Sequence, residues 1–163
     1  MAGWDRDLSR KSPIWRLVGL LRGDKQISTI VVGTSNTARL QASVDLALTN
    51  APAFSVQIFS SSAESVSLTC TMANQSLVLD TTRAGYGEAG IWTATIAMPS
   101  NNTLALDILI DRSTLEIFAQ DGTVITAKVF PRYQESENIK IVSHNGKTAF
   151  NSIVLTALGS AWT

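Results

Sequence analysis

Short apolar segments separated by Gly, Asn, Asp, Ser or Pro run through the chain from about residue 27 onward. Strands that alternate with turns at intervals of roughly eight to twelve residues are typical of sandwiches and barrels. No segment shows helical periodicity. The pattern predicts an all-β fold, a two-sheet antiparallel β-sandwich, with strands at Thr29–Val32, Leu40–Leu48, Phe54–Ser60, Ser65–Met72, Ser76–Asp80, Ile91–Ile96, Leu104–Asp111, Leu115–Gln120, Val124–Phe130, Ile139–Ser143 and Ser152–Leu158.

The first 26 residues do not follow this rhythm. They contain one candidate strand, Ile14–Val18, and then a charged break at Arg22–Lys25. We therefore expect two parts, a leader at 1–26 that comes from something else and a sandwich domain at 27–163.

Composition excludes several classes of function. The formal net charge is zero and no stripe of Lys and Arg is interleaved with aromatic residues, so nucleic acid is not expected as a partner. No apolar run approaches the ~18 residues of a membrane span, and Leu17–Leu21 is too short for the core of a signal peptide. One cysteine, Cys70, and one histidine, His144, supply too few ligands for a zinc site, and we expect no metal or cofactor.

Two acceptor sequons for N-glycosylation occur, at Asn74 and Asn101. Such triplets suit surface loops of a secreted protein.

The segment Gly85–Gly90, GYGEAG, matches the dinucleotide pattern G-x-G-x-x-G. That pattern needs a following helix whose N-terminus holds a pyrophosphate. The residues that follow, IWTATIAM, favour a strand instead. We therefore expect a glycine-rich loop and no nucleotide site.

The acidic residues of ILIDRSTLEIFAQDG, Ile108–Gly122, invite comparison with a glycosidase pair. Such a pair lies about 5 Å apart in retaining enzymes and roughly 6.5–9.5 Å apart in inverting ones. Asp107 and Asp111 should lie roughly 13 Å apart along one strand. Asp121 belongs to a turn and Asp111 is expected to cap the Arg112-Ser113 bend, so we expect structural roles for them.

Two Asx-Gly pairs, Asp121-Gly122 and Asn145-Gly146, predict two-residue hairpin turns. The first would place Phe118 opposite Ile125 and Glu116 opposite Ala127. Glu116 would then be largely buried, so we expect Arg112, Arg83 or backbone N–H groups to bind it. His144, beside the second turn, is expected to be exposed, and no nucleophile-elbow motif accompanies it.

Aromatic residues offer another route to function. Trp92 and Tyr86 flank the glycine-rich loop, and Arg83 precedes it. Exposed rings can stack on sugar faces, although packing inside a core or between domains is an equally natural use of them.

The segment Leu104–Pro131 resembles the signature of the C-terminal β-sandwich of glycoside hydrolase family 32, the invertases, inulinases and levanases. The family stretch contains V-D-R-S-S-V-E-V-F, a turn with Gly, and a strand that ends in I-F-P. The matching positions, with the turn residue Asp121, are Asp111, Arg112, Ser113, Glu116, Phe118, Asp121, Gly122, Phe130 and Pro131.

Three further segments resemble this family in the same order. Leu77–Gly85 is similar to L-D-R-(S/T)-x-S-G, with Thr81 in place of the usual first Arg. The ending LGSAWT resembles a closing Ser-x-Trp, and Arg6–Val18 is similar to the segment that finishes the catalytic propeller, with Asp5 in place of Pro. The resemblance implies that residues 1–26 are the propeller's last strand plus a linker.

The family's catalytic carboxylates lie in W-(M/L)-N-D-P-N-(G/A), R-D-P and E-C motifs, and none of these occurs in the chain. The resemblance therefore implies a non-catalytic module of a β-fructosidase that acts on sucrose or fructan. Its expected partner is the family's catalytic propeller, or a second copy bound through the exposed former interface. The parent enzyme is expected to be extracellular. The alternative is a free-standing fructan-binding, lectin-like module that uses Trp92, Tyr86 and Arg83.

Overall fold

The computed structural model describes residues 16–120 and 122–159. Those residues form strands and no helix, which confirms the predicted all-β class. No helix long and apolar enough to cross a membrane occurs among them. The strands are β1 (Arg16–Ile27), β2 (Thr29–Thr34), β3 (Thr37–Asp45), β4 (Ala53–Ser60), β5 (Val66–Thr71), β6 (Ser76–Asp80), β7 (Ile91–Thr95), β8 (Thr103–Asp111), β9 (Thr114–Ala119), β10 (Thr123–Lys128), β11 (Asn138–His144) and β12 (Thr148–Ala157).

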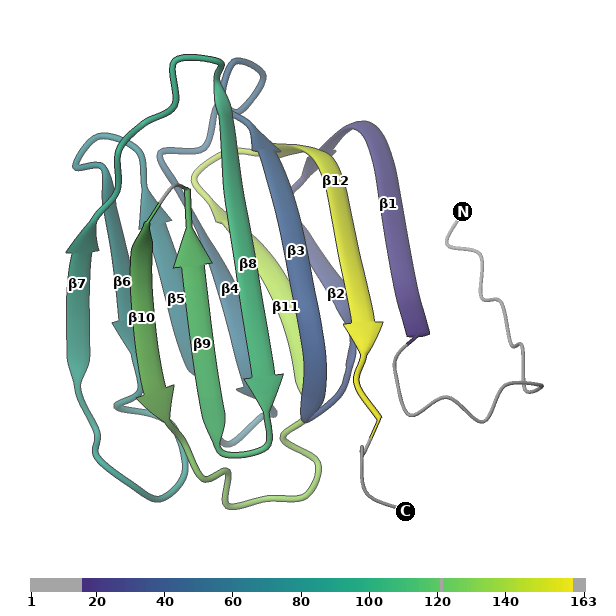
Figure 1. The fold of residues 1–163 in the computed structure, drawn as a ribbon, viewed down its shortest axis with the longest axis vertical. Coiled ribbons are helices and arrows are strands. Elements are labelled where there is room, and N and C mark those ends of the chain that lie inside the picture. The colour runs from purple at the N-terminus through teal and green to yellow at the C-terminus, as the bar shows by residue number, and fades with distance from the viewer. Residues whose placement is uncertain (1–15, 121, 160–163) are drawn as a thin grey trace.

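Two six-stranded antiparallel sheets pack face to face (Figure 1). The first sheet has the order β1-β12-β3-β8-β9-β10, and the second has the order β2-β11-β4-β5-β6-β7. This is the predicted two-sheet sandwich. Each of the eleven strands predicted from residue 29 onward overlaps one of β2 to β12, with ends that differ by at most four residues.

The core forms where the inner faces of the two sheets meet. β5 alternates buried and half-buried residues along its whole length, as expected of a strand with one face in a core. Phe54 on β4 and Phe150 on β12 meet edge to face, with ring centroids 5.9 Å apart, and so join the two sheets. Both rings are almost fully buried.

The hairpin predicted at Asn145-Gly146 is wrong, because β11 and β12 belong to different sheets. The segment between them crosses from one sheet to the other. Asn145 does take the left-handed conformation, with φ of 55°. Gly146 is required for a different reason, since a Cβ there would lie 2.8 Å from the Cα of Ala51.

The register predicted for the β9–β10 hairpin is also wrong. Ala119 pairs with Thr123 and Phe118 pairs with Val124, so the turn contains three residues instead of two. Gln120 and Gly122 both have positive φ, 49° and 140°. Asp121 itself lies outside the described residues. The alternation of apolar residues did not reveal that Gln120 belongs to the turn.

Residues 16–27 form β1, which pairs with β12 at the edge of the first sheet. The described part of the expected leader, residues 16–26, therefore belongs to the first sheet of the sandwich. Whether the leader derives from a propeller stays a prediction, and the first part of the strand predicted at Ile14–Val18 lies outside the described residues.

Candidate functional site

Five of the family-signature residues lie at one end of the sandwich, the lower end in Figure 1, namely Asp111, Arg112, Ser113, Phe130 and Pro131. The β8–β9 turn, the segment after β10 and the β6–β7 loop meet there, and we call residues 61–64, 81–92, 111–113 and 130–137 the signature end. Arg112 donates its N–H to the carbonyl of Asn36 (2.6 Å), and Val129 donates to the carbonyl of Ser113 (2.8 Å). A hollow of about 310 Å³ lies between the 111–113 turn and the 130–137 segment.

A buried carboxylate, Glu64, holds the signature end together. Its side chain accepts hydrogen bonds from the N–H groups of Gly85 (2.9 Å), Arg132 (2.9 Å) and Tyr133 (3.1 Å) and from the hydroxyl of Ser136 (2.6 Å). Glu64 is only 4% exposed. One side chain thus joins the loop after β4, the loop after β6 and the segment after β10.

The hydrogen bonds decide the charge of Glu64. Burial by itself would raise the pKa of this carboxyl group, because it disfavours the charged form. The hydrogen bonds from Ser136 and from the amides of Tyr133, Gly85 and Arg132 favour the carboxylate, and together they lower the pKa below its usual value. Glu64 is therefore a buried anion whose charge is balanced by oriented N–H and O–H dipoles.

Gly85, the first residue of GYGEAG, allows this arrangement. Its φ is +42°, and a Cβ there would lie 1.8 Å from the carbonyl oxygen of Phe130. The next residue, Tyr86, exchanges two backbone hydrogen bonds with Phe130 (2.7 and 3.1 Å). A strand, β7, follows the loop, as the sequence indicated. Gly85 therefore serves close backbone packing, whereas a Cβ on Gly87 or Gly90 would lie nearest to the ring of Phe130 or Trp92.

Exposed aromatic and arginine side chains surround the Glu64 cluster. Tyr86 is 64% exposed, Phe130 47% and Tyr133 45%. The guanidinium carbon of Arg132 lies 4.8 Å from the centre of the Tyr86 ring, and its Nε donates to the carbonyl of Gly85 (3.2 Å). Arg83 is exposed in the same loop.

Trp92 lies at the start of β7, directly opposite Leu79 of β6. It is 39% exposed. A Cβ on Gly90 would lie 2.8 Å from its ring, so the ring packs over this glycine. The three predicted sugar-binding residues therefore all lie in or beside the 81–92 loop, and one face of Tyr86 is covered by Arg132.

The prediction that Glu116 is largely buried and bound to an arginine or to amides is wrong. Glu116 is half-buried on the outer face of the first sheet, where it pairs with Leu109 and Thr126. Its carboxylate has no hydrogen bond or ion pair within 16–120 and 122–159. The one-residue difference in register explains the error, because it places Glu116 opposite an exposed threonine and not opposite Ala127.

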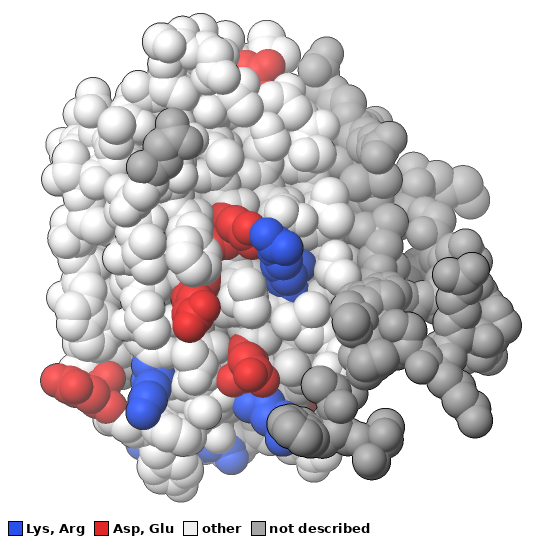
Figure 2. Space-filling model, viewed as in Figure 1, with Lys and Arg blue, Asp and Glu red and all other residues white. Residues whose placement is uncertain are grey.

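The other acidic residues of the signature do not assemble into a site. Asp107 forms a two-point ion pair with Arg39, which includes a 2.9 Å bond from Nε to Oδ1. Asp111 pairs with Thr114 around the two-residue turn Arg112-Ser113. On the face seen in Figure 2, most charged side chains lie between the middle and the signature end, where acidic and basic side chains are neighbours. Gly122 is exposed at the opposite end.

His144 is half-buried at the end of β11 and is not an exposed turn residue. Its Nε2 lies 2.7 Å from the hydroxyl of Ser55, which lies 2.7 Å from the hydroxyl of Thr69. Ser55 is 2% exposed and thus inaccessible to a substrate.

The single cysteine, Cys70, is buried, and burial raises the pKa of its thiol to about 12. No group of three His, Cys, Asp or Glu able to hold a metal occurs in the described part of the chain.

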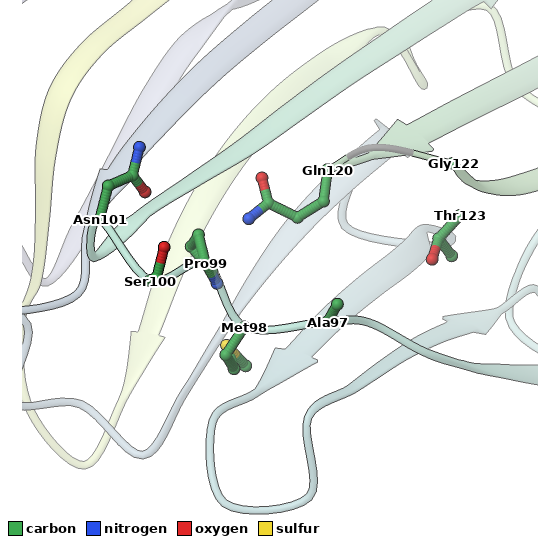
Figure 3. Close-up of a pocket in the computed structure, with 8 residues that line it drawn as sticks. All are labelled: Ala97, Met98, Pro99, Ser100, Asn101, Gln120, Gly122 and Thr123. Carbon is green, nitrogen blue, oxygen red and sulfur yellow. The ribbon is translucent and has the colours of Figure 1, made fainter.

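The opposite end of the sandwich, the upper end in Figure 1, carries both sequons. We call residues 45–52, 72–75, 97–102, 120, 122 and 123 the sequon end. A depression of about 540 Å³ lies there between the loop before β8 and the β9–β10 turn. Figure 3 shows Gln120 reaching from that turn toward Pro99, Ser100 and Asn101.

Sequence reasoning missed Glu64 as the central residue. A glutamate in a short polar loop, SSSAES, looks like any solvated charge. The sequence offered two signals, a glycine at position 85 and a Pro131-Arg132 break after β10. Neither points to Glu64 unless the topology is known.

Comparison with known proteins assigns the chain. The family model described as Glycosyl hydrolases family 32 C terminal matches residues 17–157. No curated protein sequence matches. Exo-inulinase from Aspergillus awamori is similar in structure, with a TM-score of 0.73 and 23% identity over 94% of this chain and 30% of that chain. Fructosyltransferase from A. japonicus has a TM-score of 0.75 and 17% identity, over 91% of this chain and 27% of that chain.

A galectin of Caenorhabditis elegans shares the fold alone, with a TM-score of 0.62 and 16% identity over 83% of this chain and 94% of that chain. The chain spans about 30% of the length of the inulinase. The family match covers most of the chain and agrees with the signature residues and with the sandwich topology. The protein belongs to glycoside hydrolase family 32, of which it is a C-terminal domain.

Proposed function

We propose that this chain is the non-catalytic C-terminal β-sandwich of a β-fructosidase, and that it stabilises or assembles the catalytic propeller. The main support is the family match over residues 17–157 together with a chain that spans only about 30% of a related enzyme. The family's three catalytic motifs are absent from the sequence. Sucrose or fructan is the proposed substrate of the parent enzyme, and the extracellular space is its proposed location.

The signature end is the surface proposed to meet the catalytic domain. Register supports this, because Arg16 at the start of β1 pairs with Ala157, Ala157 with Ala38, and Ala38 with Ile110 at the end of β8. A domain that precedes β1 is therefore tethered at the signature end. Aromatic residues and arginine are also enriched in protein interfaces.

The hydrolysis assay tests the non-catalytic role. Pure chain incubated with sucrose, inulin and levan should release no fructose. Release that follows the chain through successive purification steps, and that is unchanged when the expression host's own glycosidases are inhibited, would overturn the proposal.

Self-association is the proposed behaviour of the chain by itself. A surface that carries Tyr86, Phe130 and Tyr133 at 45% exposure or more has few other ways to bury its rings. Sedimentation velocity should show concentration-dependent dimers or larger species.

A fructan-binding role is the second proposal, favoured by Tyr86, whose ring is 64% exposed while Arg132 covers one of its faces. Trp92 and Arg83 lie in the same region. Titration calorimetry with inulin and levan oligosaccharides at millimolar concentration is the test. Heat that disappears in Tyr86→Ala supports binding, and no heat leaves the structural role alone.

A further inference from the structure

We propose that Asn101 carries an N-linked glycan, and that its first sugars rest in the depression formed by residues 97–101, 120, 122 and 123. This site lies at the sequon end, so it depends neither on docking at the signature end nor on fructan binding. It requires that the chain enter a secretory pathway.

The geometry of the turn presents Asn101 to solvent. Pro99 accepts a hydrogen bond from the N–H of Asn102 (3.2 Å), and Asn102 has a φ of 56°. Asn101 is exposed, and its Oδ1 accepts from the N–H of Thr103 (3.1 Å). This Asx-turn uses the carbonyl oxygen of the carboxamide. The Nδ2 atom, to which a sugar is attached, has no hydrogen bond within the described residues.

The reaction is a glycosyl transfer to that nitrogen. Nδ2 attacks the anomeric carbon of an oligosaccharide carried on a lipid pyrophosphate, so that a C–N bond forms. The bond from the anomeric carbon to the pyrophosphate oxygen breaks, the lipid pyrophosphate leaves with its electron pair, and the amide loses one proton to solvent or to a base of the transferase. No oxidant or reductant is needed.

The second sequon, Asn74-Gln75-Ser76, is held differently. Gln75 has a φ of 48° and donates its N–H to the carbonyl of Met72 (3.2 Å). Ser76 already belongs to β6 and pairs with Thr71 on one side and Thr95 on the other. No Asx-turn joins Asn74 to Ser76 in the structure. Asn101 is therefore the acceptor that the local geometry favours.

The depression beside Asn101 suits the first sugars of a glycan. Met98 and Pro99 give it apolar walls, and Thr123 lies on its other side. Gln120 is fixed along it, because its Oε1 accepts from the N–H of Ala105 (3.1 Å). Figure 3 shows Asn101 at the rim on the same side as Ser100. A sugar there would cover apolar surface that is otherwise open to water.

The test uses the full chain behind a cleavable secretory signal in a yeast host, with Asn101→Gln, Asn74→Gln and the double variant. Secreted wild type and Asn74→Gln should both lose mass on treatment with peptide N-glycosidase, and peptide mapping should place the sugar on Asn101. Asn101→Gln should lack that glycan. Asn101 unmodified in secreted protein, whatever the state of Asn74, would overturn the proposal.

Hydrogen exchange tests where the sugar rests. Protein trimmed to a single N-acetylglucosamine should exchange more slowly at residues 97–101, 120, 122 and 123 than Asn101→Gln does. Equal exchange in the two proteins would show that the glycan projects into solvent, and would overturn the placement in the depression.

Discussion

The two ends of the sandwich are built in contrasting ways from the same strands. At the signature end a buried carboxylate, Glu64, joins three segments that are far apart in sequence, and exposed rings and arginines surround it. At the sequon end, neutral groups make the long-range side-chain bonds one at a time. The Oδ1 of Asn50 accepts from the N–H of Lys147 (2.7 Å), and the hydroxyl of Thr49 accepts from the N–H of Ala149 (2.9 Å). Asp45 is a carboxylate at this end, and it accepts from the neighbouring amides of Ala47 and Leu48 (2.9 and 3.2 Å). One buried charge that binds four long-range donors should therefore contribute more to stability than neutral or local bonds that are made singly.

Replacing Glu64 and Asp45 in turn should give the largest difference in unfolding free energy between the two ends. Glu64→Ala leaves three amides and the hydroxyl of Ser136 without their partner, so we expect a loss of about 3–5 kcal/mol in the free energy of unfolding. Asp45→Ala removes a local cap on a half-buried residue and should cost about 1 kcal/mol. Urea unfolding followed by tryptophan fluorescence measures both. Equal losses would contradict the contrast.

The glycines at the two ends offer the next test. Gly85→Ala places a methyl group against the carbonyl of Phe130 at a φ of +42°, so we expect a loss of about 3 kcal/mol. Gly122→Ala has strained backbone, with a φ of +140°, but no atom within 4 Å, and should cost about 1–2 kcal/mol. Thermal unfolding compares them. A Gly85→Ala protein as stable as Gly122→Ala would show that the close approach to Phe130 is easily relieved.

Acid should weaken the signature end selectively. The pKa of Glu64 is lowered in the folded chain, so its contribution is complete above the pKa of an unfolded glutamate and is lost as pH falls through the folded value. The stability of wild type relative to Glu64→Gln should therefore shrink between neutral pH and pH 3. Urea titrations at several pH values measure the difference, and a gap that stays constant would mean that Glu64 is not charged in the native state.

The exposed rings should contribute least to stability and most to association. Tyr133→Ser and Val124→Ser each replace a side chain that is about half exposed, 45% and 53%, so each should change the free energy of unfolding by less than about 0.5 kcal/mol. Only Tyr133→Ser lies at the signature end, so only it should shift sedimentation toward monomer. The reverse pattern would place the contact surface on the outer face of the first sheet.

The sequence predicted the strands well because each has an alternating or clustered apolar pattern that local residues suffice to reveal. β6 was predicted with its observed ends. Strand pairing was harder to predict. The left-handed conformation of Gln120 changes the register of β9 and β10, and the crossing at Asn145-Gly146 depends on which sheet receives the next strand. Glu64 could not be found for the same reason. Its partners lie 21 to 72 residues away, and only the assembled fold brings them to it.

Hydroxyl-radical footprinting tests the central claim most directly. The chain is compared by itself and with a family 32 catalytic domain restored in front of β1. Tyr86, Phe130 and Tyr133 should lose reactivity in the longer protein, whereas Leu48 at the sequon end should keep it. Protection of Leu48, with the three rings at the signature end as reactive as before, would contradict the account.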